Sequence, residues 1–320
     1  MTQPSKIAFL FPGQGAQTPG MGKDFADAFP EARQVFEEAD DILQYKLSKI
    51  IFEGPEELLK TTQNSQTGIY VNSIAILKVL QKIYPELQPY VCAGLSLGEY
   101  TALTASGRLP FKECLSLVEK RSRFMNDACE KNKGTMAVII GMTPEQVDAF
   151  VLEMHMPNEL WVANYNCPGQ VVISGTFAAV AKASALAPSK GATQVVSLKV
   201  HGAFHSGLMK EAEGLLAPYV DAAPLQDSTV GFVSNVTGDF ASDLATVRSN
   251  LKTQVTHAVR WEQGILAMEK HNIDLYIEIG CGNTLSGMNK RIKVKNPSIG
   301  LQKMTQLPLI EKTMSQALGR

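Results

Sequence analysis

The feature that most constrains this chain is a serine between two glycines, where a strand-like run meets a helix-like run. Residues 90–94 are mostly apolar and lead into Gly94-x-Ser96-x-Gly98, and residues 99–105 have the composition of a helix. A Gly-x-Ser-x-Gly turn between a strand and a helix is the setting of a nucleophile elbow, which presents the serine hydroxyl on a strained backbone. The same pattern also makes an ordinary tight turn, and the motif alone leaves both interpretations open.

Strand-like and helix-like segments alternate around this motif. Strands buried on both faces of a parallel sheet are continuously apolar, as residues 6–11 and 90–94 are. Alternation of such strands with helices predicts α/β layers around a mainly parallel sheet. The remaining predicted elements are helices at 24–43, 56–60 and 69–83, within 255–268 and after 306, and strands at 230–234 and 275–279.

The middle of the chain follows a different order. Strands are predicted at 135–140, 161–166, 170–173 and 193–200, and helices at 143–154 and 178–187. The order β-α-β-β-α-β is that of a ferredoxin-like unit. We therefore expect a ferredoxin-like small subdomain at 134–200, inserted into a large α/β, hydrolase-like catalytic subdomain made of residues 1–133 and 201–320.

Composition and charge exclude several classes of protein. The chain has 320 residues, a net charge of −1 and no block of like charge, which argues against a nucleic-acid partner. No apolar run approaches the roughly 20 residues of a membrane span, and residues 1–6 do not resemble a signal peptide. The five cysteines are scattered without metal spacing. We expect a cytoplasmic protein with reduced thiols, no metal and no membrane contact.

A serine nucleophile needs a base, and histidine is the usual one. Of the five histidines, His155 and His271 lie in polar stretches, and His257 is predicted to lie at the surface. His201 and His205 follow the last predicted strand of the insert, where the chain re-enters the large subdomain. Either one can be the base, and the alternative for each is an ordinary loop histidine.

Arg121 is the most informative residue outside the motif. The positions three, four and seven residues away on both sides are all apolar, namely Cys114, Leu117, Val118, Phe124, Met125 and Ala128. Arg121 therefore lies within the buried stripe of a helix, where a guanidinium needs an anionic or dipolar partner. The partner is either a structural carboxylate or the carboxylate of a substrate gripped by two N–H groups.

A second glycine-rich loop, Gly13-Gln14-Gly15, follows the first predicted strand. It is neither a dinucleotide fingerprint nor a P-loop, because Thr18 and Gln17 stand where those motifs require glycine. The carboxyl end of a parallel strand is nevertheless where α/β sites form. The loop is either a plain turn or the source of a backbone N–H for an oxyanion.

Taken together, these segments resemble the malonyl-CoA:acyl carrier protein transacylases, and the resemblance covers essentially the whole chain. The segments that carry it are 11–17 (FPGQGAQ), 94–100 (GLSLGEY), 118–121 (VEKR), 166–175 (NCPGQVVISG), 202–206 (GAFHS), 234–238 (SNVTG) and 278–280 (EIG). Leu95 departs from the pattern, because the family usually has histidine there.

The resemblance implies a ping-pong acyl transfer that supplies fatty acid synthesis. Ser96 would attack the malonyl thioester while His205 takes its proton, and the backbone amides of Gln14 and Leu97 would hold the oxyanion. Arg121 would pair with the malonyl carboxylate. The malonyl group would then pass to the pantetheine thiol of acyl carrier protein.

The resemblance also implies the surroundings of the site. The backbone carbonyl at Gln254 would orient His205, which makes a Ser-His dyad, and the pocket would include Asn166, Gln66, Phe204 and Ser206. No cofactor is expected beyond the substrates, and a monomer is the expected state. The competing hypotheses are a serine hydrolase or thioesterase, a non-catalytic carrier-binding module and a loader for polyketide assembly.

Overall fold

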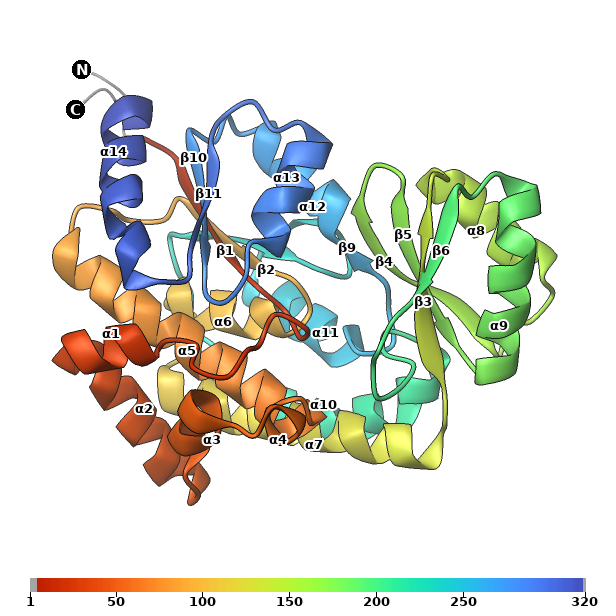
Figure 1. Ribbon diagram of the computed structural model, residues 1–320, viewed down its shortest axis with the longest axis horizontal. Helices are drawn as coiled ribbons and strands as arrows, with labels where there is room; N and C mark the ends of the chain where they lie inside the picture. Colours follow the sequence, from red (N-terminus) through yellow and green to blue (C-terminus); the bar gives the residue numbers. More distant parts are fainter. Residues whose placement is uncertain (1–4, 319–320) are drawn as a thin grey trace.

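The computed structural model describes residues 5–318 and contains two β-sheets, each with its own helices (Figure 1). The prediction that no signal peptide is present concerns residues 1–6, of which 1–4 lie outside this range. No described helix is long and apolar enough to cross a membrane. All five cysteines are buried and free.

The larger sheet has the strand order β11-β10-β1-β2-β7-β8. Every neighbouring pair is parallel except β7 and β8, so the predicted α/β fold with a mainly parallel sheet is confirmed. The strands are β1 (Ile7–Phe11), β2 (Val91–Gly94), β7 (Gly231–Ser234), β8 (Asp239–Phe240), β10 (Leu275–Ile279) and β11 (Ser298–Leu301).

The alternation of side chains along β1 divides the large subdomain into two cores. Phe9 and Phe11 belong to the larger hydrophobic cluster, whereas Ala8 and Leu10 belong to a second cluster that includes Trp261. Successive side chains of a strand point to opposite faces of the sheet, so each face receives its own layer of helices. This explains why the central strands read as continuous apolar runs.

The helices of the large subdomain occupy these two layers (Figure 1). They are α1 (Lys23–Ala28), α2 (Pro30–Leu43), α3 (Leu47–Glu53), α4 (Glu56–Leu59), α5 (Thr62–Ile83), α6 (Leu97–Ala105), α7 (Phe111–Lys131), α10 (Lys210–Ala222), α11 (Leu244–Thr253), α12 (Trp261–Glu269), α13 (Thr284–Ile292) and α14 (Leu307–Leu318). The helix predicted after residue 306 corresponds to α14.

Two of the predicted helices differ from those observed. Residues 24–43 form α1 and α2 rather than one helix, because Phe29 is extended (φ −125°, ψ 121°). Phe29 precedes Pro30, and the proline ring disfavours a helical conformation at the residue before it. The helix predicted at 69–83 begins earlier, at Thr62, because its first turns are polar and the Thr61 side chain caps them.

The smaller sheet has the order β6-β3-β5-β4-β9. Its first four strands pair antiparallel and, with two intervening helices, follow the predicted β-α-β-β-α-β order, so the ferredoxin-like fold is confirmed. The elements are β3 (Thr135–Ile140), α8 (Pro144–Glu153), β4 (Leu160–Cys167), β5 (Gln170–Gly175), α9 (Phe177–Leu186) and β6 (Gln194–Ser197). The predicted capping box is present at Thr143 and Gln146.

The fifth strand of this sheet comes from outside the insert. β9 (Val259–Arg260) pairs parallel with β4, through Asn164 and Tyr165. We propose the boundaries 134 and 200 for the small subdomain, since β3 begins at Thr135 and β6 ends at Ser197. β9 then joins the two subdomains, and it brings the segment after α11 close to β4.

Candidate active site

Ser96 lies between β2 and α6 with a backbone conformation that is unfavourable for a residue with a side chain (φ 52°, ψ −103°). The two flanking glycines allow the turn. A Cβ on Gly94 would lie 1.9 Å from the carbonyl carbon of Gly98, and a Cβ on Gly98 would lie 2.1 Å from the oxygen of Phe11. Neither position accepts a side chain, as the strand-turn-helix packing of a nucleophile elbow requires.

His205 supplies a base for this serine. Its Nε2 lies 2.8 Å from Ser96 Oγ, and its Nδ1 lies 2.9 Å from the backbone oxygen of Gln254 and 3.1 Å from that of His257. A carbonyl oxygen only accepts, so we assign the proton to Nδ1, which leaves Nε2 free to accept a proton from the hydroxyl.

The surroundings of His205 keep its imidazole neutral. Burial lowers its pKa to about 4, and the nearby Arg121 guanidinium acts in the same direction. A neutral imidazole can act as a general base at neutral pH. His201, the other candidate, has a side chain that is 40% exposed and contacts Glu130 at 2.7 Å, away from Ser96.

Arg121 is placed by α7 beside the nucleophile and is only 1% exposed. Its Nη1 donates to Gln66 Oε1, and its Nη2 donates to Gln254 Oε1 at 2.9 Å and to Ser96 Oγ at 3.0 Å. All these partners are neutral, and within residues 5–318 no carboxylate forms an ion pair with Arg121. A structural ion pair therefore does not explain this buried cation, whereas an anionic ligand bound next to Ser96 does.

Gln254 connects the nucleophile, the base and the guanidinium. Its backbone oxygen accepts from His205, which is the contact that the family resemblance implies. Its side chain does more: Oε1 accepts from Arg121, and Nε2 donates to the backbone oxygen of Ser96 at 2.9 Å. Gln254 is fully buried, so these contacts are protected from water.

Two backbone N–H groups are available beside Ser96. In the described part of the chain, neither the N–H of Leu97, at the start of α6, nor that of Gln14 donates to another atom. Their loops touch, because Leu95 N–H donates to Phe11 O at 3.0 Å and a Cβ on Gly13 would lie 2.5 Å from Leu95 O. This packing suits a pair of oxyanion donors.

The four residues predicted to line the pocket have different surroundings. Gln66 contacts Arg121 directly, and its Nε2 lies 3.3 Å from Gln14 Oε1. Phe204 is buried in the larger core. Ser206 Oγ donates to Ala203 O at 2.6 Å and accepts from Leu208 N–H, so it shapes the loop that carries His205.

Asn166, the fourth residue, is buried near the end of β4. Its Oδ1 has no hydrogen-bond donor among residues 5–318. No hydrogen bond within that range joins Asn166 to Ser96, His205 or Arg121. Its role at the site therefore stays a prediction.

Two buried residues belong to this network without having been predicted. Glu99 on α6 accepts hydrogen bonds from Gln254 Nε2 and from the backbone N–H of Asn235. Asn235, just after β7, accepts from Ser96 N–H at 2.6 Å and donates to Gly94 O at 2.7 Å. One signal was present for Asn235, since it follows a strand that lies next to β2 in the parallel sheet.

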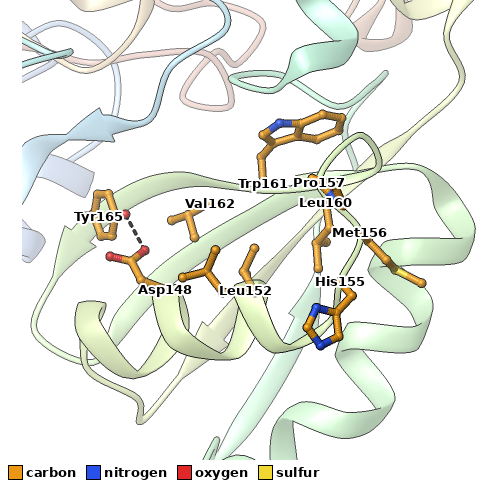
Figure 2. Close-up of a pocket in the computed structure, with 10 residues that line it drawn as sticks. Asp148, Leu152, His155, Met156, Pro157, Leu160, Trp161, Val162 and Tyr165 are labelled. Carbon is orange, nitrogen blue, oxygen red and sulfur yellow. Dashed lines mark hydrogen bonds between the residues drawn. The ribbon is translucent and has the colours of Figure 1, made fainter.

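A separate pocket of about 710 Å³ lies between α8 and β4 in the small subdomain (Figure 2). Its walls are mostly apolar, and one hydrogen bond, from Tyr165 Oη to Asp148 Oδ1 at 2.6 Å, crosses one end. The lining residues are Asp148, Val151, Leu152, His155, Met156, Pro157, Leu160, Trp161, Val162 and Tyr165. None of the predicted site residues lines it.

Within residues 5–318, no group of three or more His, Cys, Asp or Glu side chains could hold a metal ion.

Comparison with known proteins gives consistent matches. Residues 8–296 match the acyl transferase domain family. The malonyl CoA-acyl carrier protein transacylase of Bacillus subtilis is 41% identical over 315 residues, which cover 98% of each chain. The crystal structure of the Clostridium perfringens enzyme of that name superposes with a TM-score of 0.90 at 34% identity, covering 98% of each chain. A malonyl-transacylase in complex with a type II polyketide acyl carrier protein superposes with a TM-score of 0.90 at 33% identity, covering 99% of this chain and all of that one.

Proposed function

Because this chain belongs to the acyl transferase family, we propose that it transfers the malonyl group of malonyl-CoA to the pantetheine thiol of acyl carrier protein, through a malonyl ester on Ser96. The observation that carries the proposal is the buried Arg121, whose Nη2 lies 3.0 Å from Ser96 Oγ. A cation next to the nucleophile selects an acyl group that bears its own carboxylate.

In the first half-reaction, Ser96 Oγ bonds to the thioester carbon while its proton moves to His205 Nε2, 2.8 Å away. The negative charge that develops on the thioester oxygen is stabilised by the free N–H groups of Gln14 and Leu97. When the C–S bond breaks, the imidazolium returns the proton to the leaving CoA sulfur. Among residues 5–318, no carboxylate contacts His205 Nδ1, which faces the Gln254 and His257 carbonyls instead.

In the second half-reaction, the carrier thiol occupies the place that CoA left. His205 accepts the thiol proton, the sulfur bonds to the malonyl carbon, and the ester bond to Ser96 breaks as Oγ regains a proton from the imidazolium. His205 is 4% exposed and Arg121 is 1% exposed. Such a dry site favours the thiol over water, so transfer prevails over hydrolysis.

Selectivity for malonyl follows from the charge of Arg121. The malonyl carboxylate can replace neutral oxygens as the partner of this buried cation, and it accepts two parallel N–H bonds. An acetyl group leaves the cation with neutral partners only, which makes its transition state less stable. A serine hydrolase or thioesterase for simple acyl chains has no use for a buried cation at this position.

The remaining parts of the proposal are a role in fatty acid synthesis, a cytoplasmic location, a monomeric state and no cofactor beyond the substrates. The alternative pathway is polyketide assembly, which one structural neighbour represents through its polyketide carrier partner. Both pathways use the same half-reactions at Ser96.

Mass spectrometry after mixing the protein with malonyl-CoA tests the proposal. We expect a malonyl adduct on Ser96 that disappears when holo acyl carrier protein is added, with malonyl appearing on the carrier. Ser96→Ala is the control and should remain unmodified. An unmodified wild-type protein would support a non-catalytic carrier-binding module, and an adduct lost to water rather than to the carrier would support a thioesterase.

A further inference from the structure

We propose that Glu99 is a positioning residue for acyl transfer, whose carboxylate sets the orientation of the Gln254 amide and thereby the positions of Arg121 and His205. The inference rests on the proposed function, because it takes the Ser96–His205 pair to be the reacting one. Glu99 touches neither of those two side chains through a hydrogen bond, so it acts through Gln254 and Asn235.

The contacts of Glu99 make its charge consequential. The side chain is fully buried on α6, and both carboxylate oxygens are used. One accepts from Gln254 Nε2, and the other accepts from Asn235 N–H at 3.1 Å. A buried carboxylate is costly unless it is paired or hydrogen-bonded, and here both partners are neutral donors. Burying the Glu99 carboxylate therefore costs free energy of folding, and a role in catalysis explains why a carboxylate lies there.

The carboxylate determines which end of the Gln254 amide faces which neighbour. An ionised carboxylate only accepts, so the Nε2 end of Gln254 must face Glu99, and Oε1 must then face Arg121. If the amide turned over, its NH₂ group would face the guanidinium, which also only donates. Arg121 would then lose one of its acceptors and its position beside Ser96 Oγ.

The same contact balances the charge of Arg121 without occupying its N–H groups. Glu99 and Arg121 attract one another across the Gln254 amide, and this attraction favours the charged form of each. A direct ion pair would occupy the guanidinium fork with a carboxylate, whereas an indirect one leaves it with neutral acceptors, which a substrate carboxylate can replace. Glu99, which is separated from Arg121 by the Gln254 amide, thus stabilises the buried charge of Arg121 and leaves the guanidinium able to bind malonyl.

The second contact of Glu99 supports the nucleophile. Asn235, whose N–H donates to Glu99, accepts from Ser96 N–H at 2.6 Å and donates to Gly94 O at 2.7 Å. These bonds hold both sides of the strained turn at Ser96. One carboxylate therefore links the residue that orients the base with the residue that supports the elbow.

Glu99 also changes charge in a pH range where its neighbours do not. Burial raises its pKa to about 7, against the opposing effects of the Gln254 and Asn235 hydrogen bonds and of Arg121. Its titratable neighbours are Arg121 on α7 and Tyr100, whose pKa burial raises above its usual value. His205, which contacts the Gln254 backbone, has a pKa of about 4. The carboxylate is present above pH 7 and is lost as the pH falls through 7, so kcat/KM should fall in the same range.

The test compares pH profiles of kcat/KM for malonyl transfer between pH 5.5 and 8.5. Glu99→Gln keeps the size of the side chain but has one acceptor oxygen in place of two. It can therefore accept from Gln254 Nε2 or from Asn235 N–H, and its NH₂ group faces the other donor. We expect kcat/KM of this variant to be ~10- to 100-fold lower than the wild-type value at pH 8, which is the effect of losing one hydrogen bond to a charged group. Below pH 8, kcat/KM of the variant should not change with pH. Glu57→Gln, the same change at an exposed position on α4, should behave as the wild type does.

A purely structural role for Glu99 would lower activity equally at every pH, and a Glu99→Gln profile that kept the wild-type decrease near pH 7 would overturn the proposal. If this variant does not fold, the wild type still decides. The ionisation enthalpy of a carboxylic acid is close to zero, whereas that of an imidazolium is large. The decrease in kcat/KM should therefore stay at the same pH between about 15 and about 35 °C, roughly the usual assay range. A shift of the decrease with temperature would assign it to a histidine. Failure of the proposed function looks different, because the wild type would then form no adduct on Ser96.

Discussion

The catalytic centre and the pocket of the small subdomain differ in the polarity of the side chains that form them. Around Ser96, the buried side chains are polar, and they contact one another through hydrogen bonds centred on Gln254. The pocket between α8 and β4 has about 710 Å³ of space, mostly apolar walls and one hydrogen bond between its lining residues (Figure 2). The proposed chemistry lies where buried polar groups are concentrated, whereas the apolar pocket contains none of the predicted site residues.

The physical basis of this difference is the cost of burying polar groups. A guanidinium, an imidazole and a carboxylate in one dry region cost free energy that only mutual hydrogen bonds recover. An apolar wall has no such cost and can arise from packing alone. Packing also links the two regions, because a Cβ on Gly207 would lie 2.5 Å from Cζ2 of Trp161, which lines the pocket. Trp161 thus supports the loop that follows His205.

The sharpest test of the comparison removes the base. His205→Ala should lower the rate of Ser96 malonylation by ~10³- to 10⁴-fold, because His205 is the one hydrogen-bond partner of Ser96 Oγ in the described part of the chain that can accept a proton. Rapid mixing with malonyl-CoA followed by mass spectrometry measures this rate. His201→Ala is the matched control, since this histidine lies four residues away and contacts Glu130 instead. A large loss in His201→Ala, or a small one in His205→Ala, would contradict the assignment of the base.

The next effect concerns the choice of acyl group. Arg121→Ala should lower kcat/KM for malonyl transfer by ~10²-fold or more, the cost of removing one partner of a buried charge pair. Acetyl transfer should change far less, because an acetyl group has no carboxylate for the guanidinium to bind. Steady-state assays with malonyl-CoA and acetyl-CoA measure both in the same preparation. Equal losses for the two donors would argue against a carboxylate clamp.

Most of the fold could be predicted because it depends on local patterns. The strands at 135–140 and 275–279 were predicted at their observed bounds, since their apolar runs end in glycine or turn residues. The division of α1 from α2 was missed, although Pro30 signals it. β8 and β9 have two residues each, too few for any periodicity to show. Such strands form only because neighbouring strands already offer free backbone groups.

The site was predictable in part for a similar reason. Ser96 stands in a local motif, and the apolar stripe around Arg121 marks an unusual burial. Glu99 carries no such mark, because a single glutamate in a helix is usually solvated. Its contacts with Asn235 and Gln254 join residues more than 130 positions apart. Only the packing of α6 against the ends of β7 and α11 brings them together.

The smallest expected effect concerns the apolar pocket itself. Leu152 lines it and is 75% exposed, so Leu152→Ser should change the free energy of unfolding by less than about 0.5 kcal/mol. The kcat/KM for transfer to holo acyl carrier protein should also stay within about twofold of the wild-type value, because none of the predicted site residues lines the pocket. Denaturant unfolding and carrier titrations measure the two quantities. A clear rise in KM for the carrier at unchanged stability would make the pocket part of the function and would end the distinction between the two regions.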